Sequence, residues 1–242
     1  MLAAGRGSRL GALGSGTPKW LLDVGGEVLA ERQLEAIERA GDGVASVRVV
    51  TGHAAEAIER FLAERPDGAA TLHNVDYARL NNWYSVLLPL RAVEDPDARV
   101  VVINGDLFAE TAVMAAFLEA CAATEAEALI AVDLERPLTD ESMKVEVRPD
   151  GTLDRIGKVG IDDPVGEYVG MLMARGSALA RLREALEGFV GRPEAVDEWY
   201  EGAVGSTAAA GVAWVVWPMP SGRWVEIDDD DDLAAAMELA PS

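Results

Sequence analysis

The chain has 242 residues, of which 50% are hydrophobic, and this suits one α/β domain with an ample core. Lys and Arg number 21 against 42 Asp and Glu, so the net charge is −21. Such an acidic surface repels nucleic acid and anionic lipid, which argues against both as partners. The single cysteine, Cys121, excludes an internal disulfide and a multi-cysteine metal site, and it is expected to be buried in an apolar helix.

Nothing in the sequence predicts a targeting or membrane segment. Apolar runs stay well below the ~18 residues of a membrane span, and the first residues lack the charge order of a signal peptide. A cytoplasmic location is therefore expected. Only four residues precede Gly5, so either the first strand is very short or the natural start lies upstream.

The first half of the chain alternates short apolar runs with amphipathic stretches. Residues 46–51 and 99–104 are rich in β-branched side chains and are predicted as buried strands. Helical spacing of apolar residues covers 29–40, 54–63 and 111–123. Strands alternating with helices predict βαβ units, that is, a Rossmann-like, mostly parallel sheet flanked by helices. Ligands of such sheets lie beyond the carboxyl ends of the strands, which directs attention to residues such as Asp106.

The second half changes character. Residues 143–148 and 152–158 are predicted as a hairpin around the Asp150-Gly151 turn. The elements predicted after it are strand 168–173, helices 178–190 and 194–210, strands 212–217 and 223–227, and helix 233–239. We therefore expect one domain over residues 1–242, in which the later strands form a small antiparallel lid.

A glycine-rich loop near the start carries the first chemical signal. Its glycines let backbone amides turn toward a phosphate, and Arg6, Arg9 and Lys19 concentrate positive charge in a strongly acidic chain. The dinucleotide fingerprint fails because Leu10 stands where its third glycine should be, which excludes a dinucleotide-binding dehydrogenase. The P-loop pattern fails as well, since Trp20 replaces the hydroxyl residue after the lysine.

The loop resembles the signature of a known family. Leu2-Ala3-Ala4-Gly5-x-Gly7-x-Arg9-Leu10, followed by Pro18-Lys19-x-Leu21, is similar to that of the nucleotidyltransferases that activate sugar phosphates and small phospho-alcohols. Asn104-Gly105-Asp106 and Trp224-Val225-Glu226-Ile227-Asp228 resemble the family's two metal-binding segments. The motifs span nearly the whole chain, and they imply a nucleotide-diphospho-sugar transferase-like fold.

Three further motifs resemble one branch of that family, the cytidylyltransferases of phosphocholine and 2-aminoethylphosphonate. They are Asn81-Asn82-x-Tyr84-Ser85, Met143-Lys144-Val145 and Gly166-Glu167-Tyr168-x-Gly170, and Tyr200-Glu201 resembles a further pair. The run from Asp228 to Asp232 departs from the branch, whose members more often carry Thr-Pro-Glu-Asp after the metal aspartate.

The resemblance implies a role for each matching residue. A catalytic role is implied for Arg9, Lys19 and Lys144, and Mg²⁺ binding for Asp106 and Asp228. Nucleotide binding is implied for Leu2, Ala3, Ala4, Gly5, Arg6, Gly7, Asn82 and Ser85. Binding of the acceptor is expected from Trp83, Tyr84, Glu167, Tyr168 and Glu201. CTP is the expected nucleotide, a small phosphonate or phosphate the expected acceptor, and a homodimer a candidate assembly.

The chemistry agrees with these residue types. An acceptor phosphate is ionised at neutral pH, so its attack on the α-phosphorus needs no general base, and His53 and His73 are expected to be ordinary structural residues. An anion must attack an anion, which requires cations and Mg²⁺ to neutralise and align both. Mg²⁺ prefers carboxylate oxygen.

Several alternatives remain open at this stage. Four residues of the Asp228–Asp232 run are expected to cap the last helix, and Trp214 and Trp217 are expected in the core. A sugar-1-phosphate nucleotidyltransferase and a non-catalytic nucleotide-binding module are the competing functions. The acceptor could carry a quaternary ammonium, a primary amine or a second anion, the last if Arg155, Lys158 or Arg223 points inward.

Overall fold

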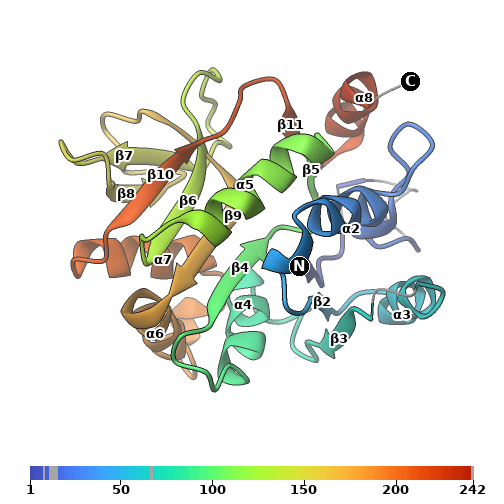
Figure 1. Cartoon of the computed structure of the whole chain (residues 1–242), viewed down its shortest axis with the longest axis horizontal. Helices are drawn as coiled ribbons and strands as arrows, with labels where there is room; N and C mark the ends of the chain where they lie inside the picture. The colour runs from blue at the N-terminus through green and yellow to red at the C-terminus, as the bar shows by residue number, and fades with distance from the viewer. Residues whose placement is uncertain (8, 11–15, 66–67, 241–242) are drawn as a thin grey trace. The chain divides into compact units, whose positions relative to one another are not determined.

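The computed structural model describes residues 1–7, 9–10, 16–65 and 68–240. The chain divides into two compact units, each built from segments that are distant in sequence (Figure 1). Unit 1 comprises Met1–Arg79, Ile103–Ala122 and Gly222–Ser242, and unit 2 comprises Leu80–Val102 and Ala123–Ser221. The prediction of a single domain over residues 1–242 stays a prediction.

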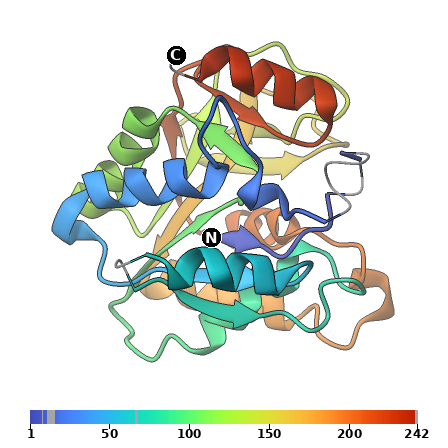
Figure 2. The same ribbon diagram turned by 90° about the vertical axis from the view of Figure 1, so that its right-hand side faces the viewer.

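A parallel sheet forms the first layer of unit 1. Its order is β1 (Leu2–Ala3), β2 (Arg48–Thr51) and β3 (Ala70–His73), and both pairings are parallel. Helices α2 (Leu29–Arg39) and α3 (Ala55–Ala63), blue and teal in Figure 2, bury their apolar faces in the core cluster that holds the sheet residues. This arrangement confirms the predicted α/β class with a parallel sheet flanked by helices.

A two-stranded antiparallel ribbon completes the sheet structure of unit 1. Strand β5 (Leu107–Ala109) pairs with β11 (Trp224–Glu226), so two segments more than a hundred residues apart lie side by side. Their buried side chains share a core cluster with η1's flanking residues and α8 (Asp230–Leu239). The remaining elements of this unit are η1 (Lys19–Leu21), η2 (Gly41–Gly43) and α5 (Thr111–Ala123), in which Cys121 is buried as predicted.

A mixed sheet forms the centre of unit 2. Its order is β10 (Trp214–Pro218), β6 (Ala128–Asp133), β9 (Gly166–Arg175), β7 (Lys144–Val147) and β8 (Leu153–Gly157), and β4 (Arg99–Ile103) also pairs with β9. The β10–β6 pair is parallel, whereas β6–β9, β9–β7 and β7–β8 are antiparallel. The antiparallel strands that the sequence predicts as a lid are therefore continuous with this sheet.

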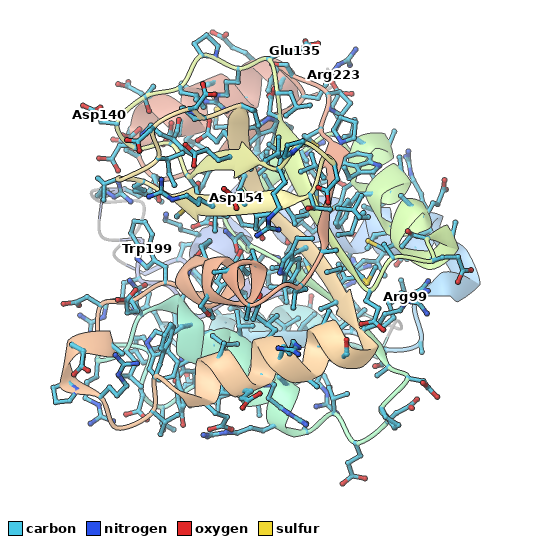
Figure 3. All side chains as sticks on the ribbon, turned by 90° about the vertical axis from the view of Figure 1, so that its left-hand side faces the viewer. Arg99, Glu135, Asp140, Asp154, Trp199 and Arg223 are labelled. Atoms are coloured by element: carbon cyan, nitrogen blue, oxygen red, sulfur yellow. The ribbon has the colours of Figure 1, made fainter. Side chains whose placement is uncertain are left out.

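The helices of unit 2 are α4 (Asn82–Arg91), α6 (Gly176–Glu187), η3 (Pro193–Ala195) and α7 (Tyr200–Ala209). Helices α6 and α7 lie side by side in Figure 3. The sequence predicts one helix over 194–210, but the structure breaks it before Tyr200, where Trp199 adopts an extended conformation. Gly202 and Gly205 both lie within α7.

Among the α-helices and strands of the described residues, the sequence does not predict β3, α4, β5 and β6. Strand β6 is buried at every position and closely follows the apolar helix α5. Its sequence therefore lacks the alternation of apolar and polar residues that marks a strand. Helix α4 contains Pro89, a residue that normally ends a helix. Among the described residues, no helix is long and apolar enough to cross a membrane.

Candidate functional site

The register of the β5–β11 ribbon brings the two predicted metal aspartates together in unit 1. Leu107 pairs with Glu226, and beyond that pair the backbone N–H of Ile227 donates to the carbonyl of Asp106 at 2.9 Å. Asp106 immediately precedes β5, and Asp228 follows Ile227. Because the strands are antiparallel, these two positions lie at the same end of the ribbon.

Gly105 allows this end of the β5–β11 ribbon to lie close to strand β1. Its N–H donates to the carbonyl of Leu2 at 3.0 Å, and Asn104 forms a parallel bridge with Leu2. A Cβ atom on Gly105 would lie 2.3 Å from the Leu2 oxygen, so only glycine fits without a backbone shift. The Asn-Gly-Asp motif thereby fixes Asp106 next to the strand that begins the glycine-rich loop.

The ammonium of Lys19 lies between the two aspartates. Its Nζ is 2.5 Å from Oδ1 of Asp228 and 3.4 Å from Oδ2 of Asp106. The lysine side chain is 13% exposed, and the two carboxylates are 25% and 27% exposed. Three predicted site residues from three distant parts of the sequence therefore form one cluster.

The cluster shifts the protonation equilibria of its members. Burial alone would lower the pKa of Lys19, but Asp106 and Asp228 outweigh it, and the pKa of the ammonium is raised. Burial raises the pKa of Asp106, with Asp228 adding to the rise and Lys19 opposing it. Lys19 is thus held as a cation at neutral pH by the two carboxylates.

A buried amide network, which the sequence analysis did not identify, holds this cluster in place. The indole Nε1 of Trp20 donates to Oε1 of Gln33 at 2.8 Å. The Nε2 amide of Gln33 donates to the carbonyls of Asn104 at 3.0 Å and Leu107 at 2.7 Å. Gln33 thus links the neighbour of Lys19 to both sides of Asp106. The available signal was a glutamine on the otherwise apolar face of the predicted helix 29–40.

The other two cations of the loop, Arg9 and Arg6, make different contacts in the structure. Arg9 donates from Nη2 to Oδ2 of Asp228 at 2.7 Å and is 57% exposed, so it belongs to the cluster. Arg6 instead lies over the ring of Tyr77, 5.6 Å from its centroid. Gly7 has a φ of +60°, and a Cβ there would be 3.0 Å from Cγ of Lys19, so glycine lets the loop pack on the lysine stem.

The aspartate run after β11 caps helix α8, as the sequence predicts. Asp229 accepts from the N–H groups of Asp231 and Asp232, each at 3.0 Å, which completes a capping box with Asp232. The carboxylate of Asp232 also accepts the N–H of Asp228 at 2.9 Å. The cap therefore fixes the backbone of the residue whose carboxylate meets Lys19.

The donor set fits Mg²⁺, which takes one or two carboxylates from a protein and fills its remaining positions with water and phosphate oxygen. Asp106 and Asp228 converge on one cation in this structure, so the same oxygens are placed to hold a divalent one. Among the described residues, no group of three or more His, Cys, Asp or Glu side chains is arranged for a metal. A metal held here would accordingly depend on substrate phosphate for further ligands.

The predicted acceptor residues all lie in unit 2, and two of them, Glu167 and Tyr168, are on strand β9 beside β7, which carries Lys144. Lys144 pairs with Glu167 across the two strands, and its Nζ donates to the carbonyl of Lys158 at 3.0 Å. Burial raises the pKa of Glu167, while Arg136, 3.8 Å away, opposes the rise. These strands bring a cation and a partly buried carboxylate to adjacent positions.

Two of the three aromatic residues predicted to contact the acceptor, Trp83 and Tyr168, are almost wholly buried. Trp83 is 1% exposed and packs edge-on against Phe189, so core packing accounts for its position. The hydroxyls of Tyr168 and Tyr200 are hydrogen-bonded at 2.9 Å, and Tyr168 is 4% exposed. Tyr84 lies half-buried under the guanidinium of Arg91.

The remaining predicted residues of unit 2 lie on two helices. Asn82 and Ser85 are on α4, where Oδ1 of Asn82 accepts the N–H of Tyr200 at 3.0 Å and Ser85 is 4% exposed. Glu201 is on the first turn of α7 and is 5% exposed. The backbone of Leu2, Ala3, Ala4 and Gly5 lies in unit 1, where the carbonyl of Ala4 accepts the N–H of His53.

The three cations that could have met a second anion are engaged with side chains of the chain itself. Arg155 faces Glu146 and Asp162, and Arg223 donates to Glu110 at 2.6 Å. Lys158 donates to Glu141 at 2.9 Å, and its ammonium lies 4.5 Å from the centroid of the Trp199 ring. Figure 3 labels Trp199 at the end of the segment that leads into α7.

Comparison with known proteins adds independent findings. The MobA-like NTP transferase domain matches residues 1–203. CMP-5'-(3-aminopropyl)phosphonate synthase of Streptomyces rubellomurinus is 34% identical over 251 residues, which cover 98% of this chain and 37% of that protein. Choline-phosphate cytidylyltransferase of Streptococcus pneumoniae is 33% identical over 106 residues, 44% of this chain and 43% of that protein. The matched region is thus less than half the length of either relative.

Solved structures share the fold. The CTP:phosphocholine cytidylyltransferase of Streptococcus pneumoniae superposes with a TM-score of 0.77 at 19% identity, covering 98% of this chain and 96% of that one. The inositol-1-phosphate CTP transferase of T. maritima gives 0.76 at 18% identity, with 98% and 94% covered. At these identities the likeness concerns the fold alone.

Proposed function

The chain belongs to the MobA-like NTP transferase family, and from this premise we propose that it transfers the cytidylyl group of CTP to a small phosphonate or phospho-alcohol. An acceptor oxygen attacks the α-phosphorus of CTP and forms a new P–O bond. The bond between the α-phosphorus and the bridging oxygen breaks, and pyrophosphate leaves. The product is a CMP-linked phosph(on)ate anhydride.

The observation that carries the proposal is the ammonium of Lys19 between Asp106 and Asp228. In the proposed reaction Lys19 and Arg9 neutralise the triphosphate and the departing pyrophosphate, which lowers the cost of bringing two anions together. Mg²⁺, held by Asp106 and Asp228, would supply electrostatic stabilisation of the charge that develops on the phosphate oxygens. The loop backbone from Leu2 to Gly7 is proposed to bind the nucleoside.

Lys144 is proposed to hold the phosphonate or phosphate of the acceptor. It stands beside Glu167 in the β7–β9 register, so a cation and a carboxylate are offered to an acceptor that carries both an anionic and a cationic end. The two relatives, a CMP-5'-(3-aminopropyl)phosphonate synthase and a choline-phosphate cytidylyltransferase, are named for acceptors of this kind, which supports the proposal.

A pyrophosphate-release screen tests the proposal. Each of the four ribonucleoside triphosphates is combined with Mg²⁺ and one acceptor at a time: 3-aminopropylphosphonate, 2-aminoethylphosphonate, phosphocholine or glucose 1-phosphate. We expect release with CTP and at least one of the first three acceptors. The proposed function would be contradicted if glucose 1-phosphate were the only acceptor to give release, or if none of the four acceptors gave release.

A further inference from the structure

The Asn81-Asn82 pair makes three hydrogen bonds with the segment that leads into helix α7. The backbone N–H of Asn81 donates to the carbonyl of Val196, and its Nδ2 donates to the carbonyl of Asp197, both at 3.0 Å. Oδ1 of Asn82 accepts the N–H of Tyr200, also at 3.0 Å. Three hydrogen bonds therefore tie two adjacent residues to a stretch of five, more than a hundred positions away.

The two asparagines cap two different helices. Oδ1 of Asn81 accepts the N–H of Asn82 at 2.8 Å, at the start of α4. Helix α7 begins at Tyr200, and its own N-cap residue, Trp199, makes no capping hydrogen bond with its side chain. The first N–H groups of a helix have no partner within it, and Asn82 supplies one of the missing acceptors from the neighbouring helix.

The segment held in this way reaches the strands that carry Lys144 by two routes. The hydroxyl of Tyr200 is hydrogen-bonded to that of Tyr168, the residue after Glu167 on β9. The ring of Trp199 lies against the ammonium of Lys158, whose carbonyl accepts a hydrogen bond from Lys144. The position of α7's first turn, including the buried Glu201, is thus coupled to the surroundings of Lys144.

We infer that Asn82, together with Asn81, is a positioning residue for the acceptor: it fixes residues 196–201, and through them Trp199 and Tyr200, around Lys144. The inference rests on the proposed function for the role of Lys144. The hydrogen bond that matters is accepted by Oδ1, whereas a direct contact of the side-chain amide with a nucleotide would use Nδ2 as a donor. This difference makes the two roles separable.

The pair of variants N82A and N82D tests the inference. Aspartate keeps an oxygen that accepts the Tyr200 N–H and places a negative charge where a helix N-terminus favours it, whereas alanine removes the acceptor. We expect N82A to raise the KM for the acceptor about tenfold while the KM for CTP stays near that of the wild type. N82D should keep both KM values near wild type. A rise in the KM for CTP in both variants would instead assign Asn82 to the nucleotide and overturn the inference.

Hydrogen exchange gives a readout that needs no activity. Amides of residues 196–201 should exchange faster in N82A than in the wild type and at the wild-type rate in N82D, with the rest of the chain unchanged. Unaltered exchange in N82A, or faster exchange without a change in the acceptor KM, would overturn the inference. If the wild type transfers no cytidylyl group, the proposed function fails, and the exchange result still decides whether Asn82 holds the segment.

Discussion

Nζ of Lys19 lies 2.5 Å from Oδ1 of Asp228, although 209 positions separate the two residues in the chain. The contact depends on the register of β5 and β11, which also sets Asp106 beside the same ammonium. One cation shared by two carboxylates neutralises part of the repulsion between them. Under the proposed function, the same two carboxylates would hold Mg²⁺ while Lys19 meets the triphosphate.

The aspartates are expected to be essential for turnover. Replacing either by asparagine, D106N or D228N, removes one negative oxygen ligand and should lower kcat by roughly 10³ or more while the protein stays folded. The measurement is pyrophosphate release at saturating Mg²⁺, with circular dichroism to verify folding. The matched control is D230N, which makes the same change at an exposed position in the first turn of α8. Near wild-type rates for D106N or D228N would remove that residue from the site.

The two lysines should separate kinetically. K19A is expected to impair the use of CTP, because Lys19 lies in the loop cluster of unit 1, whereas K144A should chiefly raise the KM for the acceptor. Arg192 offers a control, since it is 55% exposed and pairs only locally with Glu194 among the interactions described for it. Initial rates over a grid of CTP and acceptor concentrations give both constants. A K144A variant with a raised KM for CTP alone would contradict the assignment.

The Gln33 network should contribute strongly to stability. The variant Q33L leaves the Trp20 indole and the carbonyls of Asn104 and Leu107 without their amide partner, and we expect it to lose roughly 2 to 4 kcal/mol of unfolding free energy. Urea denaturation measures the loss. The control E35Q, two residues along the same helix, breaks an exposed pair with Arg39 and should cost less than about 0.5 kcal/mol. Equal losses of unfolding free energy in Q33L and E35Q would show that the Gln33 network stabilises the fold no more than an exposed ion pair does.

Glu167 should make stability fall with rising pH. Because burial raises its pKa in the folded protein, the folded state binds more protons than the unfolded state once the pH passes the ordinary value of 4.5. The contribution of Glu167 is therefore fully present at lower pH and is lost as pH rises through the folded pKa. Urea denaturation of wild type and E167Q across this window should show the wild type losing stability relative to the variant.

An exposed glutamate provides the control for this prediction. Glu119 lies on the exposed side of α5, and E119Q is measured over the same pH range as the matched variant. A constant difference between wild type and E167Q at all pH values would contradict the expected titration.

The sequence predicts the cluster of Lys19, Asp106 and Asp228 better than it predicts the residues and strands around this cluster. Lys19, Asp106 and Asp228 are recognisable because each stands in a local motif, and the structure brings all three together. The role of Gln33 does not follow from its place on the predicted helix, since two of its three partners are backbone carbonyls of a distant segment. Strand β6 escaped prediction because it is buried on both faces and shows no alternation.

The asparagine pair also makes tertiary contacts that its motif does not predict. The motif Asn81-Asn82-x-Tyr84-Ser85 predicts membership of a branch, but it cannot show that the oxygen of Asn82 caps a helix that begins at Tyr200. Trp83 in the same motif was expected to face the acceptor, and in the structure it is almost wholly buried against Phe189. Capping and packing between distant segments depend on tertiary contacts that local patterns do not contain.

The most direct test of cytidylyl transfer is to identify the product by phosphorus NMR. Wild-type protein, CTP, Mg²⁺ and 3-aminopropylphosphonate, 2-aminoethylphosphonate or phosphocholine are incubated together, and the phosphorus resonances are followed over time. We expect free pyrophosphate to appear together with a pair of coupled resonances from a new anhydride between CMP and the acceptor. A parallel sample contains glucose 1-phosphate in place of these acceptors. Formation of a nucleotide sugar in that sample, with no anhydride from any of the three small acceptors, would contradict this prediction.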